Sequence, residues 1–330
     1  MINTIAPLTG WALDSVAELD RHAPGFAGAY LRASDERRQV IAAYLAVAPI
    51  PFDDGHRARL AADFLGGANH RAILRAGFGS VPVGLRGALA RSGPQPLDRR
   101  YYERLFKLLS RPPHREIVRT INQLPLLDHD RLRIAQRLPA QVCFANVVAV
   151  ITSVREARDV ATLIDLLITN RADAEGLFAA IRSVESARAL AGVWQRWSRR
   201  TTFGHHPVPA SPAYMPIVGA NDLRRLGLRF QNCAERYIVG CLDGLDAFAE
   251  FKADGKALVV HLRRKQDQWM VEGMFGKHNA CPPPALRAEA IAYLAQHGVG
   301  EKPPREAASG EWEVLNRLAH PLRFELEMDD

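Results

Sequence analysis

The side chains best suited to chemistry lie in the segment RFQNCAERYIVGC at residues 229–241. It places an amide beside a thiol, in Asn232 and Cys233, where a loop is expected to give way to a helix. The dipole of a helix favours a thiolate at its N-terminal end, and a nearby cation lowers the thiol pKa further. Cys233 is therefore a candidate nucleophile, and the structural alternative is a cysteine packed in the core.

A second polar segment, GMFGKHNACPPP at residues 273–284, follows an expected strand. Lys277, His278 and Asn279 place three polar side chains on this exit loop, between glycines and prolines that shape it. Loops held on a rigid scaffold often carry functional groups, although any exposed connection between a strand and a helix uses the same residue types. We expect Lys277 and Asn279 to bind a ligand, and His278 to be one candidate base for Cys233.

The expected strand pairing supplies a second candidate base, His261, and an acidic neighbour, Glu272. Three runs with strand character, at 246–253, 256–263 and 268–275, predict an antiparallel meander whose first turn is Asp254-Gly255. With residues 264–267 as a four-residue second turn, Val260 would face Val271. The expected apolar face then contains Leu258, Val260, Leu262, Trp269, Val271 and Phe275. His261 and Glu272 would be diagonal neighbours on the other face, provided that this register holds.

The two motifs NCAERY and GKHNACPP, separated by these strands, resemble the PcfJ-like family, which occurs in conjugative plasmids, phages and related mobile elements. The matching residues are Asn232, Cys233, Tyr237, Gly276, Lys277, Asn279 and Pro282 or Pro283. The resemblance covers about residues 225–285 and implies that the two motifs form one site, with Tyr237 among its binding residues. It implies no specific reaction, and it does not extend to the preceding helical region.

The elements that would position these residues fall into two regions. Residues 10–200 contain a succession of short amphipathic helical patterns and few strand signals; one helix is expected to begin at Ser153 and Glu156, which have capping-box spacing. After residue 212 the order becomes two short helices, three strands and a helix. The sequence predicts an α+β protein, with a mainly helical domain at 1–205 and a small α+β domain with a three-stranded antiparallel meander at 212–330.

The positive charge of the chain belongs to the helical region. Of the net +7, residues 1–200 contain 28 Lys+Arg against 19 Asp+Glu, whereas residues 201–330 contain 15 against 17. Lys107 is the one lysine among those 28 cations. Arginine forms planar, bidentate contacts with phosphate, which suits a nucleic-acid surface. The alternative is a compositional bias, such as a GC-rich genome that encodes arginine throughout.

The helical region ends in WQRWSRR, residues 194–200, which alternates aromatic and basic side chains. Trp194 and Trp197 could stack on bases while Arg196, Arg199 and Arg200 bind phosphates. The alternative is that the two tryptophans pack against the neighbouring domain and the arginines face water. We include all five as candidate binding residues.

Several other classes of protein are disfavoured. No run reaches the roughly 18 apolar residues of a membrane span and the N-terminus lacks a signal-peptide pattern, so we expect a cytoplasmic protein without a membrane partner. Cys233, Cys241, His278 and Cys281 are zinc-ligand types, but their spacing lacks a tight Cys-x2-Cys pair. No glycine-rich phosphate loop or serine nucleophile motif is present. We therefore expect no metal and no cofactor.

Three functions remain open. The first is a nucleic-acid-associated accessory protein of a mobile element or phage-related system, which binds DNA or RNA through the basic helical domain and has a polar pocket in the second domain. The second is an enzyme centred on Cys233, with His261, Glu272 or His278 in support. The third is a scaffold that binds another protein. The sequence leaves the ligand and the oligomeric state open.

Overall fold

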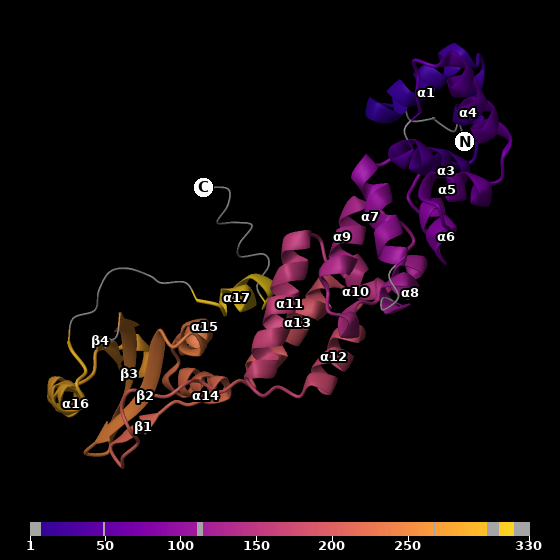
Figure 1. Ribbon diagram of the computed structural model, residues 1–330. Helices are drawn as coiled ribbons and strands as arrows, with labels where there is room; N and C mark the ends of the chain where they lie inside the picture. Colours follow the sequence, from indigo (N-terminus) through magenta and orange to yellow (C-terminus); the bar gives the residue numbers. More distant parts are fainter. Residues whose placement is uncertain (1–7, 49, 111–114, 267, 302–309, 320–330) are drawn as a thin grey trace. The chain divides into compact units, whose positions relative to one another are not determined.

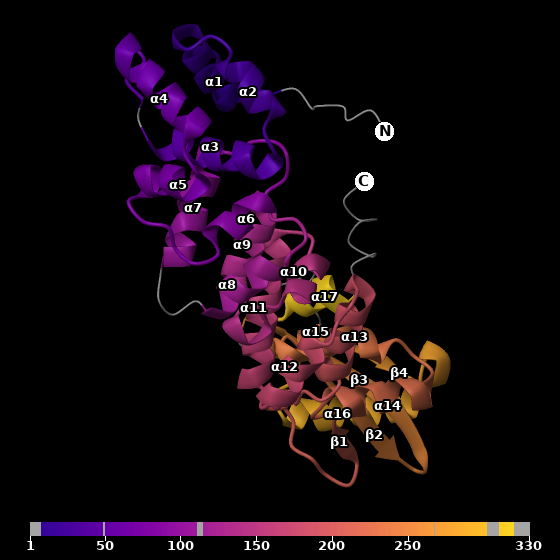
Figure 2. The same ribbon diagram turned by 90° about the vertical axis from the view of Figure 1, so that its right-hand side faces the viewer.

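The computed structural model describes residues 8–48, 50–110, 115–266, 268–301 and 310–319 (Figures 1 and 2). The chain divides into two compact units, residues 1–157 and residues 158–330. We call them unit 1 and unit 2. No helix in the described ranges is long and apolar enough to cross a membrane.

Unit 1 is helical throughout its described residues. Its elements are α1 (Gly10–His22), α2 (Phe26–Arg32), α3 (Asp35–Val47), α4 (Gly55–Gly67), α5 (His70–Phe78), α6 (Leu85–Ala90), α7 (Arg99–Ser110), α8 (Arg115–Gln123), α9 (His129–Arg137), the 3-10 helix η1 (Ala140–Val142) and α10 (Ala145–Val150). Side-chain caps begin several of them: Ser34, Asp54, Asn69 and Asp128 each accept a hydrogen bond from a backbone N–H in the first turn of the helix that follows. These caps explain why so many short helices form.

A buried polar contact helps to hold α3 against α7 inside unit 1. The hydroxyl of Tyr102 donates to Oε1 of Gln39 at 2.8 Å, and both side chains are almost fully buried. The amide of Gln39 in turn donates to the carbonyl oxygens of Gly93 and Gln95. Because each buried polar group has a partner, this contact fixes the packing of two helices without a desolvation penalty.

Helix α11 (Val154–Thr169) spans the division between the units. As expected, Ser153 caps it, and its Oγ accepts a hydrogen bond from the N–H of Glu156. The Glu156 carboxylate bonds back to the N–H of Thr152 at 2.7 Å, one residue earlier than an ideal capping box requires.

Unit 2 adds two more helices before the sheet, α12 (Ala174–Arg182) and α13 (Ala187–Ser198). The remaining elements are β1 (Tyr214–Pro216), α14 (Ala220–Phe230), the 3-10 helix η2 (Ala234–Tyr237), α15 (Ile238–Leu242), β2 (Asp246–Ala253), β3 (Lys256–Lys265), β4 (Gln268–Phe275), the 3-10 helix η3 (Lys277–Asn279), α16 (Pro284–Gln296) and α17 (Glu313–Ala319). The α+β class is thus confirmed.

The sheet of unit 2 has four strands in the order β1-β2-β3-β4, all antiparallel, so the expected number of three was wrong. The additional strand, β1, has three residues and pairs Tyr214 with Phe251 of β2. Three residues are too few to show the alternation of apolar and polar side chains by which a strand is predicted. The segment becomes a strand because it pairs with the edge of β2. The first hairpin is as expected, because Ala253 pairs with Lys256 across Asp254-Gly255, and both turn residues have positive φ.

The register of β3 and β4 differs from the expected one. Lys265 pairs with Gln268 and Leu262 with Val271, so the expected four-residue turn at 264–267 was wrong. A β-bulge follows, because His261 pairs with Gly273 and leaves Glu272 as the extra residue. After the bulge, each side chain of β4 lies on the face of the sheet opposite to the one expected from the predicted register.

Two hydrophobic clusters cover the two faces of the sheet. One contains Leu258, Val260 and Leu262 with residues of α16, and Trp269 and Val271 pack against it, as expected. The bulge places Met274 in this cluster in the position expected for Phe275. The other cluster contains Phe248 and Val259 with residues of α14 and α15. Figure 1 shows α14 and α15 on one side of the sheet and α16 on the other.

The expected domain boundary, between residues 205 and 212, coincides with the change from helices to sheet. The compact units, however, divide at residues 157/158, because α13 contacts α17, which in turn contacts α15. Helices α12 and α13 are therefore grouped with the sheet rather than with the preceding helices. A separation of folding units near 205–212 stays a prediction.

Candidate functional site

A buried histidine and a carboxylate form the centre of the polar cluster in unit 2. His261 in β3 and Asp246 at the start of β2 are both buried, and His261 Nε2 lies 2.7 Å from Asp246 Oδ1. The carboxylate accepts the hydrogen bond, which places the proton on Nε2 when the ring is neutral. This contact orients the imidazole and compensates for burying the acid.

Arg263 extends this pair to a second acid. Its Nε donates to Asp246 Oδ1 at 3.2 Å, and its Nη1 lies 3.6 Å from Glu272 Oε1. The register that would have made Glu272 a diagonal neighbour of His261 was wrong. Glu272 is the extra residue of the bulge, and it reaches the cluster through Arg263. The Glu272 Oε2 atom is buried and has no hydrogen-bond partner among the described residues.

Two aromatic rings enclose the imidazole of His261. Phe248 stacks on it with ring centroids 4.3 Å apart, and Tyr237 meets it edge-on at 4.6 Å. Burial raises the pKa of Tyr237, and the nearby Cys233 raises it further. A ring that is 2% exposed between two aromatic side chains cannot take a proton from a substrate in this conformation, so the geometry favours a structural or positioning role for His261.

Cys233 is exposed, so it does not pack in the core as the structural alternative required. It precedes η2 and α15, which total nine residues, rather than one continuous helix. Within the described residues, neither His261 nor His278 forms a hydrogen bond with its thiol. Asn232 accepts a hydrogen bond from the N–H of Ala234 through its side-chain oxygen, which shapes the turn before η2.

Lys277, His278 and Asn279 form η3, and all three are exposed. His278 and Asn279 both have positive φ, 58° and 57°, which is uncommon for residues other than glycine. The η3 segment contacts α14, the helix that leads into Asn232 and Cys233. Both motifs thus lie on the face of the sheet that α14 covers, and a single site formed by them stays a prediction.

Two of the five candidate nucleic-acid ligands at residues 194–200 are in the wrong place for that role. Trp194 is fully buried and Trp197 is 6% exposed, so neither can stack on a base in this conformation. Packing of the two rings against the neighbouring domain stays a prediction. Arg200 lies over the Trp197 ring at 4.6 Å, and Arg199 pairs with Glu235 at 3.5 Å. Arg196 is exposed and stays a candidate.

A cavity of about 500 Å³ opens beside the His261 cluster in unit 2. Asp246 and Arg263 line it on the sheet, and it extends along the end of η2, α15 with the turn that follows it, and the first residues of α17. The volume falls within the range of small-molecule sites, roughly 300–1,000 Å³. The described residues contain no group of three or more His, Cys, Asp or Glu side chains that could hold a metal ion.

Unit 1 accounts for the whole net charge of the chain. Its residues contain 21 Lys+Arg against 14 Asp+Glu, whereas unit 2 contains 22 of each. Within unit 1 the excess is concentrated at residues 55–137, where 16 cationic side chains accompany six acidic ones. The basic character therefore follows α4 to α9 and does not extend to the segment 194–200.

Arginines four residues apart recur on the helices of this basic region. Arg71 and Arg75 lie on α5, and both are exposed; Arg133 and Arg137 repeat the spacing on α9. Residues four apart share a helix face, and like charges there destabilise a helix by about 0.2–0.5 kcal/mol. No ion pair or hydrogen bond engages the side chains of Arg71, Arg75 or Arg137 within the described residues. These guanidinium groups are free to bind an anion.

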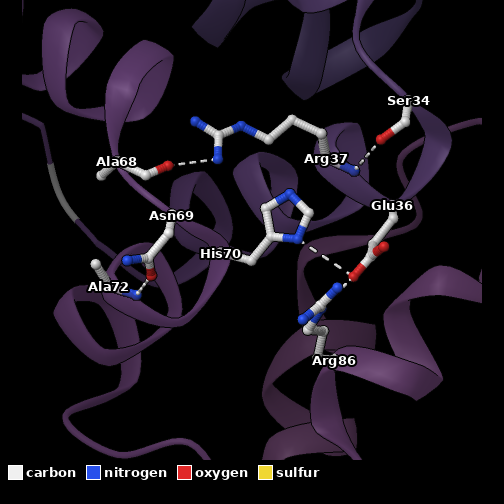
Figure 3. A network of polar contacts seen from close by, with 8 residues as sticks. All are labelled: Ser34, Glu36, Arg37, Ala68, Asn69, His70, Ala72 and Arg86. Atoms are coloured by element: carbon white, nitrogen blue, oxygen red, sulfur yellow. Dashed lines mark hydrogen bonds and ion pairs between the residues drawn. The ribbon is translucent and has the colours of Figure 1, made fainter.

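A network of polar contacts holds the start of α5 against α3 (Figure 3). His70 Nδ1 lies 3.2 Å from Glu36 Oε1, and Arg86 of α6 donates to the same oxygen. The hydrogen bond from Arg86 is the largest of the causes that lower the Glu36 pKa. The guanidinium of Arg37 bonds to carbonyl oxygens at the end of α4. Side chains of α3 thus contact α4, α5 and α6, and these contacts hold in place the helix that carries Arg71 and Arg75.

Comparison with known proteins gave no match to any protein-family model, characterised protein or solved structure. The resemblance of residues 225–285 to the PcfJ-like family thus stays a prediction.

The residues that organise the cluster, Asp246 and Arg263, were not predicted from the sequence, and neither was the contribution of α17 to the cavity. The first two could have been found from the Asp254-Gly255 turn. A two-residue turn there places Asp246 directly opposite Arg263, and His261 diagonally across from Asp246. The contribution of α17 had no local signal, because it comes from the packing of a distant segment.

Proposed function

We propose that this chain is a nucleic-acid-associated protein whose unit 1 binds the phosphate backbone of DNA or RNA through the arginines of α5, α7 and α9. The observation that supports the proposal is the concentration of the net charge in unit 1, where arginines recur at a four-residue spacing and Arg71, Arg75 and Arg137 are exposed. Arginine binds phosphate oxygens bidentately, and such contacts depend little on sequence. An accessory role in a mobile element, which the PcfJ-like resemblance implies, is part of this proposal.

Two alternatives have less support. A Cys233-dependent enzyme is supported by the exposure of the thiol, but His261 is enclosed by two aromatic rings, and His278 forms no hydrogen bond with the thiol within the described residues. A protein scaffold would account for a stack of helices but not for unpaired arginines. The salt dependence of binding distinguishes the two proposals. A nucleic-acid-binding protein must bind DNA or RNA less tightly as the salt concentration rises, whereas a protein scaffold need not bind nucleic acid at all.

The test is binding of the full chain to fluorescently labelled single-stranded DNA, double-stranded DNA and RNA, measured by anisotropy at several salt concentrations between about 50 and 200 mM. Release of counterions requires that log K fall linearly with log salt, with a slope of about 0.9 for each phosphate neutralised on duplex DNA. Replacing Arg71 and Arg75 with glutamine should weaken binding to every sequence and reduce that slope by about 2.

The matched control replaces Arg21 and Arg32 with glutamine. This pair lies on α1 and α2, outside the basic region, and removes the same two charges. The control should bind nearly as tightly as the unaltered chain. Absence of binding at low salt, or equal losses in both double variants, would refute a site on α5.

A further inference from the structure

The cavity in unit 2 keeps opposite charges apart on different elements. Its cationic residues come from η2 and the end of β3: Arg236, Arg263, Arg264 and Lys265. Its acidic residues, apart from Asp246 in the His261 cluster, are Asp243 at the end of α15 and Glu313 of α17. No ion pair joins Asp243 or Glu313 to Arg236, Arg263 or Lys265 in the described part of the chain. Arg236 and Lys265 likewise form no ion pair there.

The acidic side of the cavity is held in place by backbone contacts. Asp243 Oδ1 accepts a hydrogen bond from the N–H of Trp312 at 3.0 Å, which links the end of α15 to the start of α17. Gly310 lies so close that a Cβ on it would meet the Asp243 carboxyl group at 2.0 Å. Glu313 contacts the side-chain amide of Asn316 at 3.3 Å. These contacts position both carboxylates but leave acceptor capacity on each.

The arrangement carries an electrostatic cost that a ligand would relieve. Burial raises the pKa of Asp243, and the charges of Glu313 and Glu311 raise it further, although the N–H of Trp312 opposes them. Carboxylates brought together in this way are stabilised by N–H donors placed between them. On the other side, Arg236 and Lys265 both line the cavity, so an anion bound there would be attracted by both charges.

We propose that this cavity binds a nucleoside monophosphate, with the phosphate at Arg236 and Lys265 and the N–H donors of the base at Glu313 and Asp243. Arginine and lysine are the usual protein ligands of phosphate, and Asp and Glu accept hydrogen bonds from base amino groups. Tyr237 adds aromatic surface to the wall. The volume of about 500 Å³ suits a ligand of this size. Two sources share this chemistry, a free nucleotide and the phosphorylated end of a strand.

This inference rests on unit 2 alone and does not depend on the arginines of unit 1. Isothermal titration of the full chain with GMP, UMP, guanosine and inorganic phosphate tests it. GMP should bind most tightly because guanine offers two adjacent N–H donors to a carboxylate, and phosphate alone should bind at least tenfold more weakly. Competition between GMP and a 5′-phosphorylated oligonucleotide, in a chain that also carries Arg71→Gln and Arg75→Gln, distinguishes a strand end from a free nucleotide.

Two substitutions assign the ends of the ligand. Lys265→Ala should weaken GMP binding at least tenfold while leaving guanosine binding unchanged, and Glu313→Gln should reduce the preference for GMP over UMP. Lys256→Ala and Glu289→Gln are the matched controls, since Lys256 lies at the other end of the same strand and Glu289 on the outer surface of α16, and neither lines the cavity. The proposal is overturned if no nucleotide binds at millimolar concentration, if phosphate binds as well as GMP, or if the control substitutions weaken binding equally.

Discussion

His261 and Asp246 form a buried hydrogen-bonded pair, with 2.7 Å between Nε2 and Oδ1. The same carboxylate oxygen accepts a hydrogen bond from Arg263, so one acid neutralises or orients two neighbours on β3. The pair joins β2 to β3, and Asp246 lines the cavity together with Arg263. Its stability and the shape of the cavity are therefore coupled.

Removing the carboxylate should destabilise unit 2 strongly. Asp246→Ala leaves the His261 ring without its acceptor and Arg263 without its closest anion, and breaking a buried charged contact of this kind costs about 3–5 kcal/mol. Asp246→Asn retains an acceptor oxygen and should cost less. Unfolding in urea, followed by circular dichroism, measures both. Asp222→Asn is the control, because Asp222 forms a surface pair at 3.7 Å and should change stability by less than about 0.5 kcal/mol.

The four cysteines should separate into two classes in a thiol-labelling experiment. Cys233 and Cys281 are exposed, whereas Cys143 and Cys241 are buried. Burial raises the pKa of Cys143 to about 11 and also raises the pKa of Cys241, which disfavours the reactive thiolate at both. An aromatic disulfide reagent should therefore modify two thiols in the native chain and four after unfolding.

Substitution of the same cysteines distinguishes a surface thiol from a core thiol. Cys233→Ser should change the free energy of unfolding by less than about 0.5 kcal/mol, whereas Cys241→Ser should cost about 1–3 kcal/mol, because it buries a hydroxyl group in an apolar cluster. Loss of GMP or nucleic-acid binding in Cys233→Ser with unchanged stability would assign the thiol a direct role. A large loss of stability in that variant would contradict its exposed position.

His206 should make stability fall in mild acid. Burial is the largest cause that lowers its pKa from the ordinary value of 6.5, so the unfolded chain binds a proton more readily than the folded chain. The contribution of this residue is fully present above pH 6.5 and is lost as the pH falls below that value. Urea midpoints measured from pH 7.5 to 5.5 should therefore decline, and the decline should be smaller in His206→Gln. His56→Gln is the control, because His56 is exposed and lies in unit 1, and the decline should be as large as in the unaltered chain.

Particular residues show where sequence reasoning succeeded and where it failed. The hairpin at Asp254-Gly255 was predictable because two residues with positive φ determine both the turn and the register around it. The register between β3 and β4 was not predictable. The bulge at Glu272 depends on the pairing of β4 with β3, and no pattern in the sequence of either strand indicates it. Trp194 and Trp197 had the spacing of both a core and a base-stacking surface, and only the packing of α13 distinguishes the two.

The last prediction concerns Gly240, a cavity residue that limits the space around Asp246. A Cβ added there would lie 1.9 Å from Asp246 Oδ2, and Asp246 cannot move away without losing His261 and Arg263. Gly240→Ala should therefore cost about 1–3 kcal/mol, the usual range for overpacking. In a chain that already contains Asp246→Ala the same substitution should cost almost nothing, because the obstructing carboxylate is gone. Urea unfolding of the two single variants and the double variant completes the cycle, and additive costs would show that the glycine and the acid do not interact.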